Sequence, residues 1–221
     1  MKAGNCSYGC AKDVPSVIPV FPLPEALLLP RADMPLNIFE PRYLAMIDAA
    51  MSGDRIVGMV QIDEAAPACS RGPGLRKIGC AGRIVSYAET GDGRYMITLT
   101  GIARFRIVEE FRESATPFRL CRITAEPFSV DFDSAEQMID RNAVLRAFRS
   151  YLTAHDLDAD WESVGRASNE TLVNALAMMA PFGAAEKQAL LEAPDLKARA
   201  ETLVAIAEMA IPRPGAGRTL Q

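Results

Sequence analysis

The spacing of apolar residues changes near residue 126, and this change limits the folds that the chain can adopt. From Val17 to Glu126 the apolar residues form short alternating or continuous runs, which are typical of strands. After Phe132 they recur every three or four residues, which is typical of amphipathic helices. Two such blocks in series predict the α+β class, with a β-rich part followed by a bundle of helices.

Strand-like runs dominate the first block, and glycines interrupt the longest of them. The runs cover residues 17–21, 55–62, 76–90, 94–110 and 118–126. Gly-Asp-Gly at 91–93 predicts a tight turn that joins two long strands into a hairpin. Gly79, Gly82 and Gly101 lie inside the runs and predict bulges or sharp bends, as a small closed barrel needs. Pro19 indicates that the first strand lies at a sheet edge, because proline cannot donate to a strand ladder.

Helical patterns occur once in the first block and throughout the second. Pro41 suits the first position of a helix predicted at 41–51. Ser134 and Gln137 form a capping box, which predicts where the first helix of the second block begins. Further helices are predicted at 170–180, at 184–193 and from Pro194 onward. The residues expected to face inward are Leu44, Ile47, Met51, Met138, Leu145, Phe148, Leu152, Leu172, Leu176, Met179, Leu196, Leu203 and Ile211.

These patterns divide the chain into a disordered lead-in (1–16), a β-barrel domain (17–125), a helical-bundle domain (126–211) and a flexible tail (212–221). Charge differs between the two domains: residues 76–125 hold nine Lys and Arg against five Asp and Glu, whereas residues 126–211 hold seven against fifteen. The lead-in has no apolar core like that of a secretion signal, and no run of about eighteen apolar residues occurs. We therefore expect a cytoplasmic protein that does not span a membrane.

Sequence motifs of the common enzyme classes are missing. There is no GxxxxGK[ST], no GxSxG and no HExxH, and the one histidine, His155, lies in a polar loop where we expect it to be exposed or to cap a helix. The five cysteines are scattered without a CxxC pair, so we expect neither a disulfide framework nor a zinc site. Acidic clusters at 131–133 and 156–160 lack the spacing of a calcium loop and are expected to cap helices or lie in solvent. We therefore expect no enzymatic activity, no metal and no cofactor.

Arginines of the β-rich block offer an alternative function. Arg83, Arg94, Arg104, Arg106 and Arg122 lie in strand-like runs of net positive charge. Arginine binds phosphates through two parallel hydrogen bonds, and small barrels often bind nucleic acid on an open face. An RNA-binding barrel is therefore the alternative reading, although the same residues are also suited to an outward, solvated face with cross-strand ion pairs.

Several stretches, in this order, resemble the N-terminal substrate-binding domain of the Lon (La) ATP-dependent protease family. They are "IPVFPLPEALLLPRADMPLNIFEPRYLAMI" (18–47), "IGCAGRIVSY" (78–87), "DGRYMITLTGIARFRI" (92–107) and "KQALLEAPDLKARAETLVAI" (187–206). The resemblance implies a PUA-like β-barrel followed by a C-terminal α-helical bundle. It also implies a non-catalytic module that binds protein substrates, since neither the ATPase motif nor the Ser–Lys peptidase module of that family is present in this sequence.

Within this resemblance, the corner "LNIFEPRYLAM" (36–46) is the candidate peptide-binding region. Phe39, Arg42 and Tyr43 would line a groove for an extended peptide, although a purely structural strand-to-helix corner is the simpler interpretation. Val17 and Val20, on the expected edge strand, and the loop 63–75 are further candidate surfaces, because an open edge can pair with a peptide backbone. The expected partners are unfolded or client polypeptides and a protease or chaperone, with nucleic acid less favoured. The sequence does not determine the oligomeric state.

Overall fold

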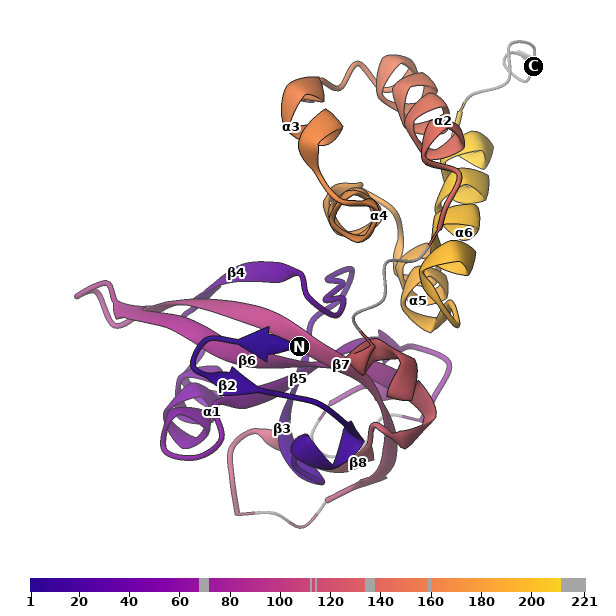
Figure 1. Ribbon diagram of the computed structural model, residues 1–221. Helices are drawn as coiled ribbons and strands as arrows, with labels where there is room; N and C mark the ends of the chain where they lie inside the picture. Colours follow the sequence, from indigo (N-terminus) through magenta and orange to yellow (C-terminus); the bar gives the residue numbers. More distant parts are fainter. Residues whose placement is uncertain (68–71, 112, 114, 134–137, 159, 212–221) are drawn as a thin grey trace, which may run out of the picture.

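Five strands form a closed barrel in the computed structural model, which describes residues 1–67, 72–111, 113, 115–133, 138–158 and 160–211. The barrel strands are β3 (Val17–Pro22), β5 (Ile56–Asp63), β6 (Gly74–Glu89), β7 (Tyr95–Glu110) and β8 (Arg119–Thr124). They lie in the order β7-β6-β5-β3-β8, and β8 pairs again with β7 to close the ring (Figure 1). Only the β3–β5 pair is parallel among these neighbours. With the helices that follow, the chain has the predicted α+β fold.

The long hairpin of β6 and β7 forms as predicted, with Gly91 and Gly93 at positive φ in its turn. Gly82 faces Gly101 directly after Ala81 faces Ala103, so Ile102 is the extra residue of a bulge. Gly101 must be glycine because a side chain there would collide with the Leu29 carbonyl. The bulge therefore lets the connection between β3 and β4 (Asp33–Ile38) approach the barrel wall.

The first strand is not at a sheet edge, contrary to the expectation from Pro19. β3 lies between β5 and β8, and Val20 is fully buried. Pairing with β5 begins only at Val20, so Pro19 is not required to donate to that neighbour. The true edge is β4, which pairs with the first half of β7 and with no other strand among the described residues.

Helix α1 (Pro41–Met51) follows β4 and packs against the barrel, with Pro41 at its start as predicted. Its buried residues are Tyr43, Met46, Ile47 and Ala50. Of the three residues expected to face inward, Ile47 is fully buried, whereas Leu44 and Met51 are only partly buried. The buried face is thus rotated from the predicted one, and it includes Tyr43.

Residues 1–16 are not a disordered lead-in but fold against the barrel. They form the short pair β1 (Lys2–Ala3) and β2 (Cys6–Ser7) and the 3-10 turn η1 (Ala11–Asp13). Arg83 donates to the Tyr8 hydroxyl (3.2 Å) and to Asn5 Oδ1 (3.1 Å), and the Tyr8 side chain is buried. The segment has no regular apolar period, which is why its sequence does not reveal these contacts.

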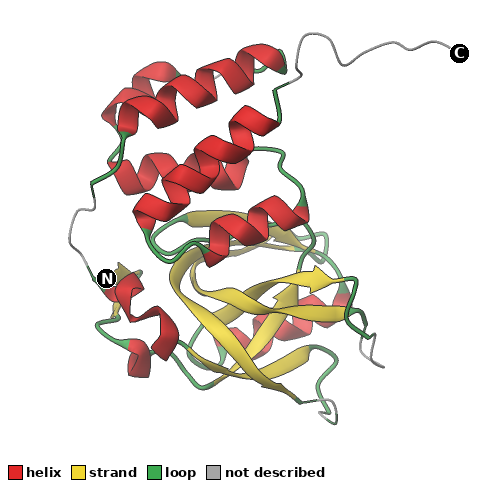
Figure 2. Ribbon diagram, turned by 90° about the vertical axis from the view of Figure 1, so that its right-hand side faces the viewer, coloured by secondary structure: helices red, strands yellow, loops and turns green. Residues whose placement is uncertain are grey.

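The second block is helical, and its helices stack on one side of the barrel (Figure 2). The predicted capping box at Ser134 and Gln137 lies outside the described residues; Asp140 caps the first long helix by accepting a hydrogen bond from Ala143 N. Met138 and Met179 are exposed rather than inward, at 84% and 82%. The predicted tail 212–221 also lies outside the described residues. The elements are η2 (Glu126–Phe132), α2 (Arg141–Ala154), α3 (Trp161–Arg166), α4 (Asn169–Met179), α5 (Ala184–Glu192) and α6 (Leu196–Met209).

A buried ion pair joins the barrel to the helices. The Arg104 guanidinium on β7 bonds both carboxylate oxygens of Asp131 in η2, with Nη2–Oδ1 at 2.7 Å and Nε–Oδ2 at 2.9 Å. The two side chains are only 1% and 6% exposed. Arg104 also donates to the carbonyls of Leu191 at the end of α5 and of Ala193 and Pro194 in the connection to α6. The acidic cluster at 131–133 was expected to cap a helix or lie in solvent, and for Asp131 this was wrong.

Further hydrogen bonds join the β3–β4 connection to α4. Asn174 donates to the Pro30 carbonyl at 3.0 Å, and Arg31 pairs with Glu170 at 2.8 Å. Arg199 of α6 donates to Asn174 Oδ1 at 3.2 Å, so it supports the same junction from the helical side. Burial and the nearby charge of Arg104 lower the pKa of Arg199 to about 10, so that it remains charged at neutral pH. In the part of the chain that is described, no helix is long and apolar enough to cross a membrane.

Replacing Arg104 tests whether this junction stabilises the fold. Arg104→Met should lower the free energy of unfolding by about 3–5 kcal/mol, because it leaves the Asp131 carboxylate buried without its partner. Arg122→Met is the matched control: Arg122 lies on β8, its side chain is 52% exposed, and it pairs with Glu109, so its loss should cost at most about 1 kcal/mol. Urea unfolding of the two variants gives the comparison.

The double variant Arg104→Met/Asp131→Leu should recover only part of the lost stability. It removes the unpaired charge, but the three carbonyls that Arg104 bonded would remain without that donor. An Arg104→Met variant no less stable than Arg122→Met would show that the buried pair does not stabilise the fold.

Candidate functional site

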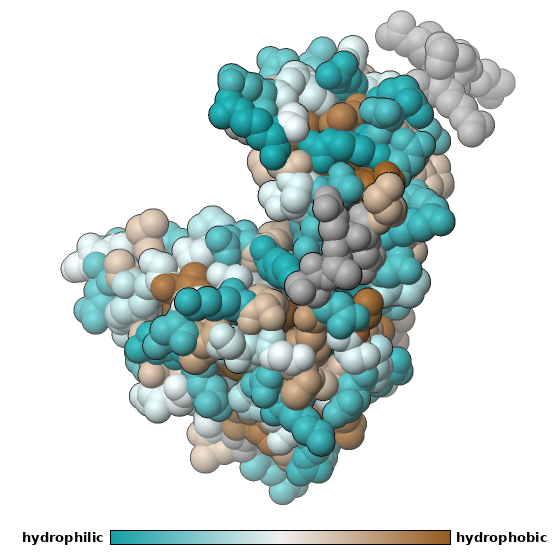
Figure 3. Space-filling view, viewed as in Figure 1, coloured by the Kyte–Doolittle hydropathy of each residue, from teal (hydrophilic) through white to brown (hydrophobic). Residues whose placement is uncertain are grey.

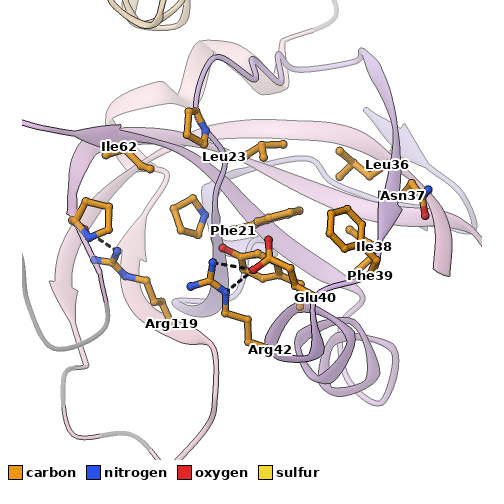
Figure 4. Close-up of a pocket in the computed structure, with 14 residues that line it drawn as sticks. Phe21, Leu23, Leu36, Asn37, Ile38, Phe39, Glu40, Arg42, Ile62 and Arg119 are labelled. Carbon is orange, nitrogen blue, oxygen red and sulfur yellow. Dashed lines mark hydrogen bonds and ion pairs between the residues drawn. The ribbon is translucent and has the colours of Figure 1, made fainter. Parts of the chain in front are cut away.

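A groove of about 340 Å³ lies beside β4, at the strand-to-helix corner that the sequence singled out (Figure 4). One wall is the end of β3 with the residues after it, and the opposite wall is the end of β4. The first turn of α1 contributes the remaining side. The lining residues are Phe21, Pro22, Leu23, Pro24, Leu36, Asn37, Ile38, Phe39, Glu40, Arg42, Tyr43, Ile62, Pro73 and Arg119.

Two aromatic rings form the apolar floor of the groove. The Phe21 and Tyr43 ring centroids are 4.3 Å apart, and both side chains are buried. Desolvation raises the pKa of the Tyr43 hydroxyl above its ordinary value, more than the nearby Arg42 charge lowers it. The hydroxyl is therefore neutral at physiological pH, and the floor carries no charge of its own.

The corner residues form one side of the groove, with one ion pair and one exposed ring. Arg42 Nε donates to Glu40 Oε2 at 3.0 Å, and the Arg42 guanidinium lies 4.5 Å from the centre of the Tyr43 ring. Phe39 is 61% exposed, which is unusual for a phenylalanine, and the Arg94 guanidinium lies 5.9 Å from its ring centre. An exposed ring beside an apolar floor is suited to contact with another apolar molecule.

The last residues of β4 border this groove. Because β4 pairs only with β7 among the described strands, its other edge has backbone groups available for a further strand. Leu36, Asn37 and Ile38 on this strand also line the groove. A peptide in extended conformation could therefore pair with the edge and place a side chain against the aromatic floor.

Gln61 fixes the wall opposite β4, and the sequence analysis missed it. It is 2% exposed; its Oε1 accepts from Glu25 N at 3.0 Å, and its Nε2 donates to the Ala26 carbonyl at 2.9 Å. These two bonds hold the segment after β3 in a turn, with Glu25 at a positive φ of 60°. A signal was available in the sequence, since Gln61 is the one amide side chain in the apolar run of residues 55–62.

The predicted peptide-binding residues do not all line the same groove. Phe39, Arg42 and Tyr43 line the groove together. Val17 is 43% exposed but lies at a different hollow, and Val20 points into the barrel core. Both were chosen because β3 was expected to be an edge strand, which it is not. Of the loop 63–75, Pro73 lines the groove, whereas residues 68–71 lie outside the described residues.

The five arginines of the RNA-binding alternative do not form one face. Arg83 and Arg104 are buried, at 7% and 1%, and both are bonded inside the protein. Arg94, Arg106 and Arg122 are exposed, and two of them pair with neighbouring carboxylates, Asp92 and Glu109. Two of the five arginines are therefore not available to phosphate.

Side chains that could carry chemistry are few in the groove. The described residues that line it include no histidine, cysteine or lysine, and their one carboxylate, Glu40, is paired with Arg42. The buried thiols of Cys80 and Cys121 lie elsewhere, and desolvation raises the pKa of both. Over the described ranges, no group of three or more His, Cys, Asp or Glu residues could hold a metal ion.

Gln61→Met tests the role of this residue in shaping the groove. The change should cost about 1–3 kcal/mol, because it leaves the Glu25 N–H and the Ala26 carbonyl without their partner. Hydrogen exchange at the Glu25 amide should accelerate more than exchange at the amide of Leu203 in the core of α6, which reports only the loss of global stability. Unchanged exchange at Glu25 would mean that the turn does not depend on Gln61.

Comparison with known proteins shows which family the sequence of this chain matches. The chain matches the family model described as "ATP-dependent protease La (LON) substrate-binding domain" over residues 17–208. Relatives include "Lon protease 2" of Myxococcus xanthus, 28% identical over 85% of this chain and 23% of that protein. "Lon protease" of Anaeromyxobacter dehalogenans is also 28% identical, over 85% of this chain and 22% of that protein. The chain thus spans about a quarter of the length of these curated relatives.

Solved structures share the fold. The Lon N-terminal domain protein from Xanthomonas campestris has a TM-score of 0.60 at 22% identity, over 86% of this chain and 97% of that one. The N-terminal domain of Mycobacterium avium complex Lon protease has the same TM-score and coverage at 16% identity. Because the family model covers nearly all of the described residues, the chain belongs to the LON substrate-binding domain family.

Proposed function

We propose that the groove beside β4 binds an extended, apolar segment of an unfolded or client polypeptide, and that the chain acts without catalysis of its own. In this role it recognises clients and presents them to a protease or chaperone. The observation that carries the proposal is the open edge of β4, which lies next to an uncharged aromatic floor and the exposed ring of Phe39.

Two kinds of contact would hold the peptide. Its backbone would pair with the free edge of β4, which gives affinity that depends little on sequence. One or two apolar side chains would enter the groove between Phe21 and Leu36, and the Phe39 ring would fold over them. Because Arg42 is already paired with Glu40, attraction to acidic peptides would contribute little.

Membership in a family described as substrate-binding supports the same role. The matched relatives are named Lon proteases, and this chain corresponds to about a quarter of each. The absence of enzymatic activity is part of the proposal. It is supported by the missing sequence motifs and by the lack of histidine, cysteine and lysine among the described residues of the groove.

The test is binding of a labelled, permanently unfolded protein, reduced and carboxymethylated α-lactalbumin, followed by fluorescence anisotropy at low and high salt. Binding should persist at high salt, because apolar contact is not screened. Phe39→Ala should weaken it by about tenfold or more, since a buried aromatic contact is worth on the order of 2 kcal/mol. Val108→Ala is the matched control: Val108 is 59% exposed on β7 and does not line the groove, so affinity should not change.

Two outcomes would contradict the proposal. Equal losses for Phe39→Ala and Val108→Ala would show that the groove does not carry binding. Binding that disappears by about 0.2 M salt would indicate charge-driven association, and the exposed arginines Arg94, Arg106 and Arg122 with RNA would then be tested instead.

A further inference from the structure

A second cavity lies within the helical part, and the function proposed above does not use it. Its volume of about 530 Å³ is in the range of sites for small organic molecules. Phe148, Tyr151 and Leu172 form a floor in which each residue is at most 4% exposed. Leu157 and Met179 stand exposed at the rim, and Figure 3 shows apolar surface between hydrophilic side chains on this part of the molecule.

Polar contacts hold α3 in place beside α2 at both of its ends. Arg141 of α2 donates to the carbonyls of Val164 and Gly165 at the end of α3, the former at 2.7 Å. The Arg149 guanidinium lies 4.6 Å from the centre of the Trp161 ring at the start of α3. The apolar residues between these contacts line a cavity instead of packing together. The contacts at the two ends of α3 therefore hold the cavity open.

The charge at this cavity has one sign. Asp158 and Asp160 line it together with apolar side chains and Thr171, whereas no Lys, Arg or His is among the described lining residues. Asp160 Oδ1 accepts a hydrogen bond from Glu162 N at 3.1 Å. The Asp158 carboxylate is exposed and forms no ion pair with any residue that the structure describes. The surrounding residues 126–211 hold fifteen acidic against seven basic side chains, which adds to the negative potential.

We propose that this cavity binds a small organic cation with an apolar body, of the aryl-alkyl amine class. The apolar body lies on Phe148, Tyr151 and Leu172, where it removes the exposed apolar surface from water. The ammonium stays at the mouth of the cavity beside Asp158, where it keeps part of its hydration. An anion of the same shape is disfavoured, because it would meet two carboxylates and no cation.

The experiment uses three probes of the same shape: 4-phenylbutylamine, the neutral 4-phenylbutanol and the anionic 4-phenylbutyrate. Affinities come from amide shifts in two-dimensional NMR, which also locate the site. The amine should shift amides of α2, α3 and α4 and bind more tightly than the alcohol, and the carboxylate should bind least. Asp158→Asn should weaken amine binding by about threefold, as expected for an exposed charge pair, and abolish its preference over the alcohol. Asp156→Asn, next to the cavity but not lining it, should have little effect.

A cavity-filling variant supplies the second test. Ala175 is half-buried and lines the cavity, so Ala175→Phe should reduce affinity for the amine by at least about tenfold. Unchanged circular dichroism would show that it folds, and unchanged binding of unfolded α-lactalbumin would separate this site from the groove. The proposal is wrong if the amine shifts no amides of α2–α4, or if the three probes bind equally. A third outcome would also overturn it. If no probe binds the unmodified protein and Ala175→Phe changes its oligomeric state, the cavity is covered by a second copy of the chain and is not a site for a small molecule.

Discussion

The buried ion pair between Arg104 and Asp131 is the interaction on which the arrangement of the two halves depends. Removing both charges from water is costly, and the cost is offset only because every donor of the guanidinium finds an acceptor. Asp131 takes the bonds on one side, and the carbonyls of Leu191, Ala193 and Pro194 take those on the other. A barrel strand, the segment after the barrel and the α5–α6 connection therefore meet at one side chain.

The same junction reaches the groove through the connection between β3 and β4. At one end of this connection, Gln61 holds the turn that forms a wall of the groove. At the other end, Gly101 lets the chain approach β7, and Asn174 of α4 bonds the Pro30 carbonyl. The wall of the groove is thus fixed both by the barrel and by the helices. The second cavity differs from it, because its described lining residues come from α2, α3, α4 and the segments between and directly after these helices.

Much of the fold could be predicted from the sequence because the strand and helix periods are local. The long hairpin, the bulge at Gly82 and Gly101, and the helix that begins at Pro41 all form as expected. The prediction that β3 is the edge strand was wrong. Pro19 shows only that one backbone N–H donor is missing, and it does not show which strands lie beside β3. Phe39, Arg42 and Tyr43 were chosen from the corner itself and do share a groove, whereas Val17 and Val20 depended on the wrong edge and do not.

The sequence by itself determined the class of the fold, the order of its two parts and the corner at which β4 becomes α1. These follow from residues close together in the chain, through apolar period, proline and glycine. Only the tertiary structure decided that β4 is the open edge, that Arg83 and Arg104 are buried, and that residues 1–16 pack on the barrel. Each of these depends on partners far apart in sequence. A charged side chain is buried only where distant acceptors meet it, and a strand is an edge only when no segment pairs with its second side.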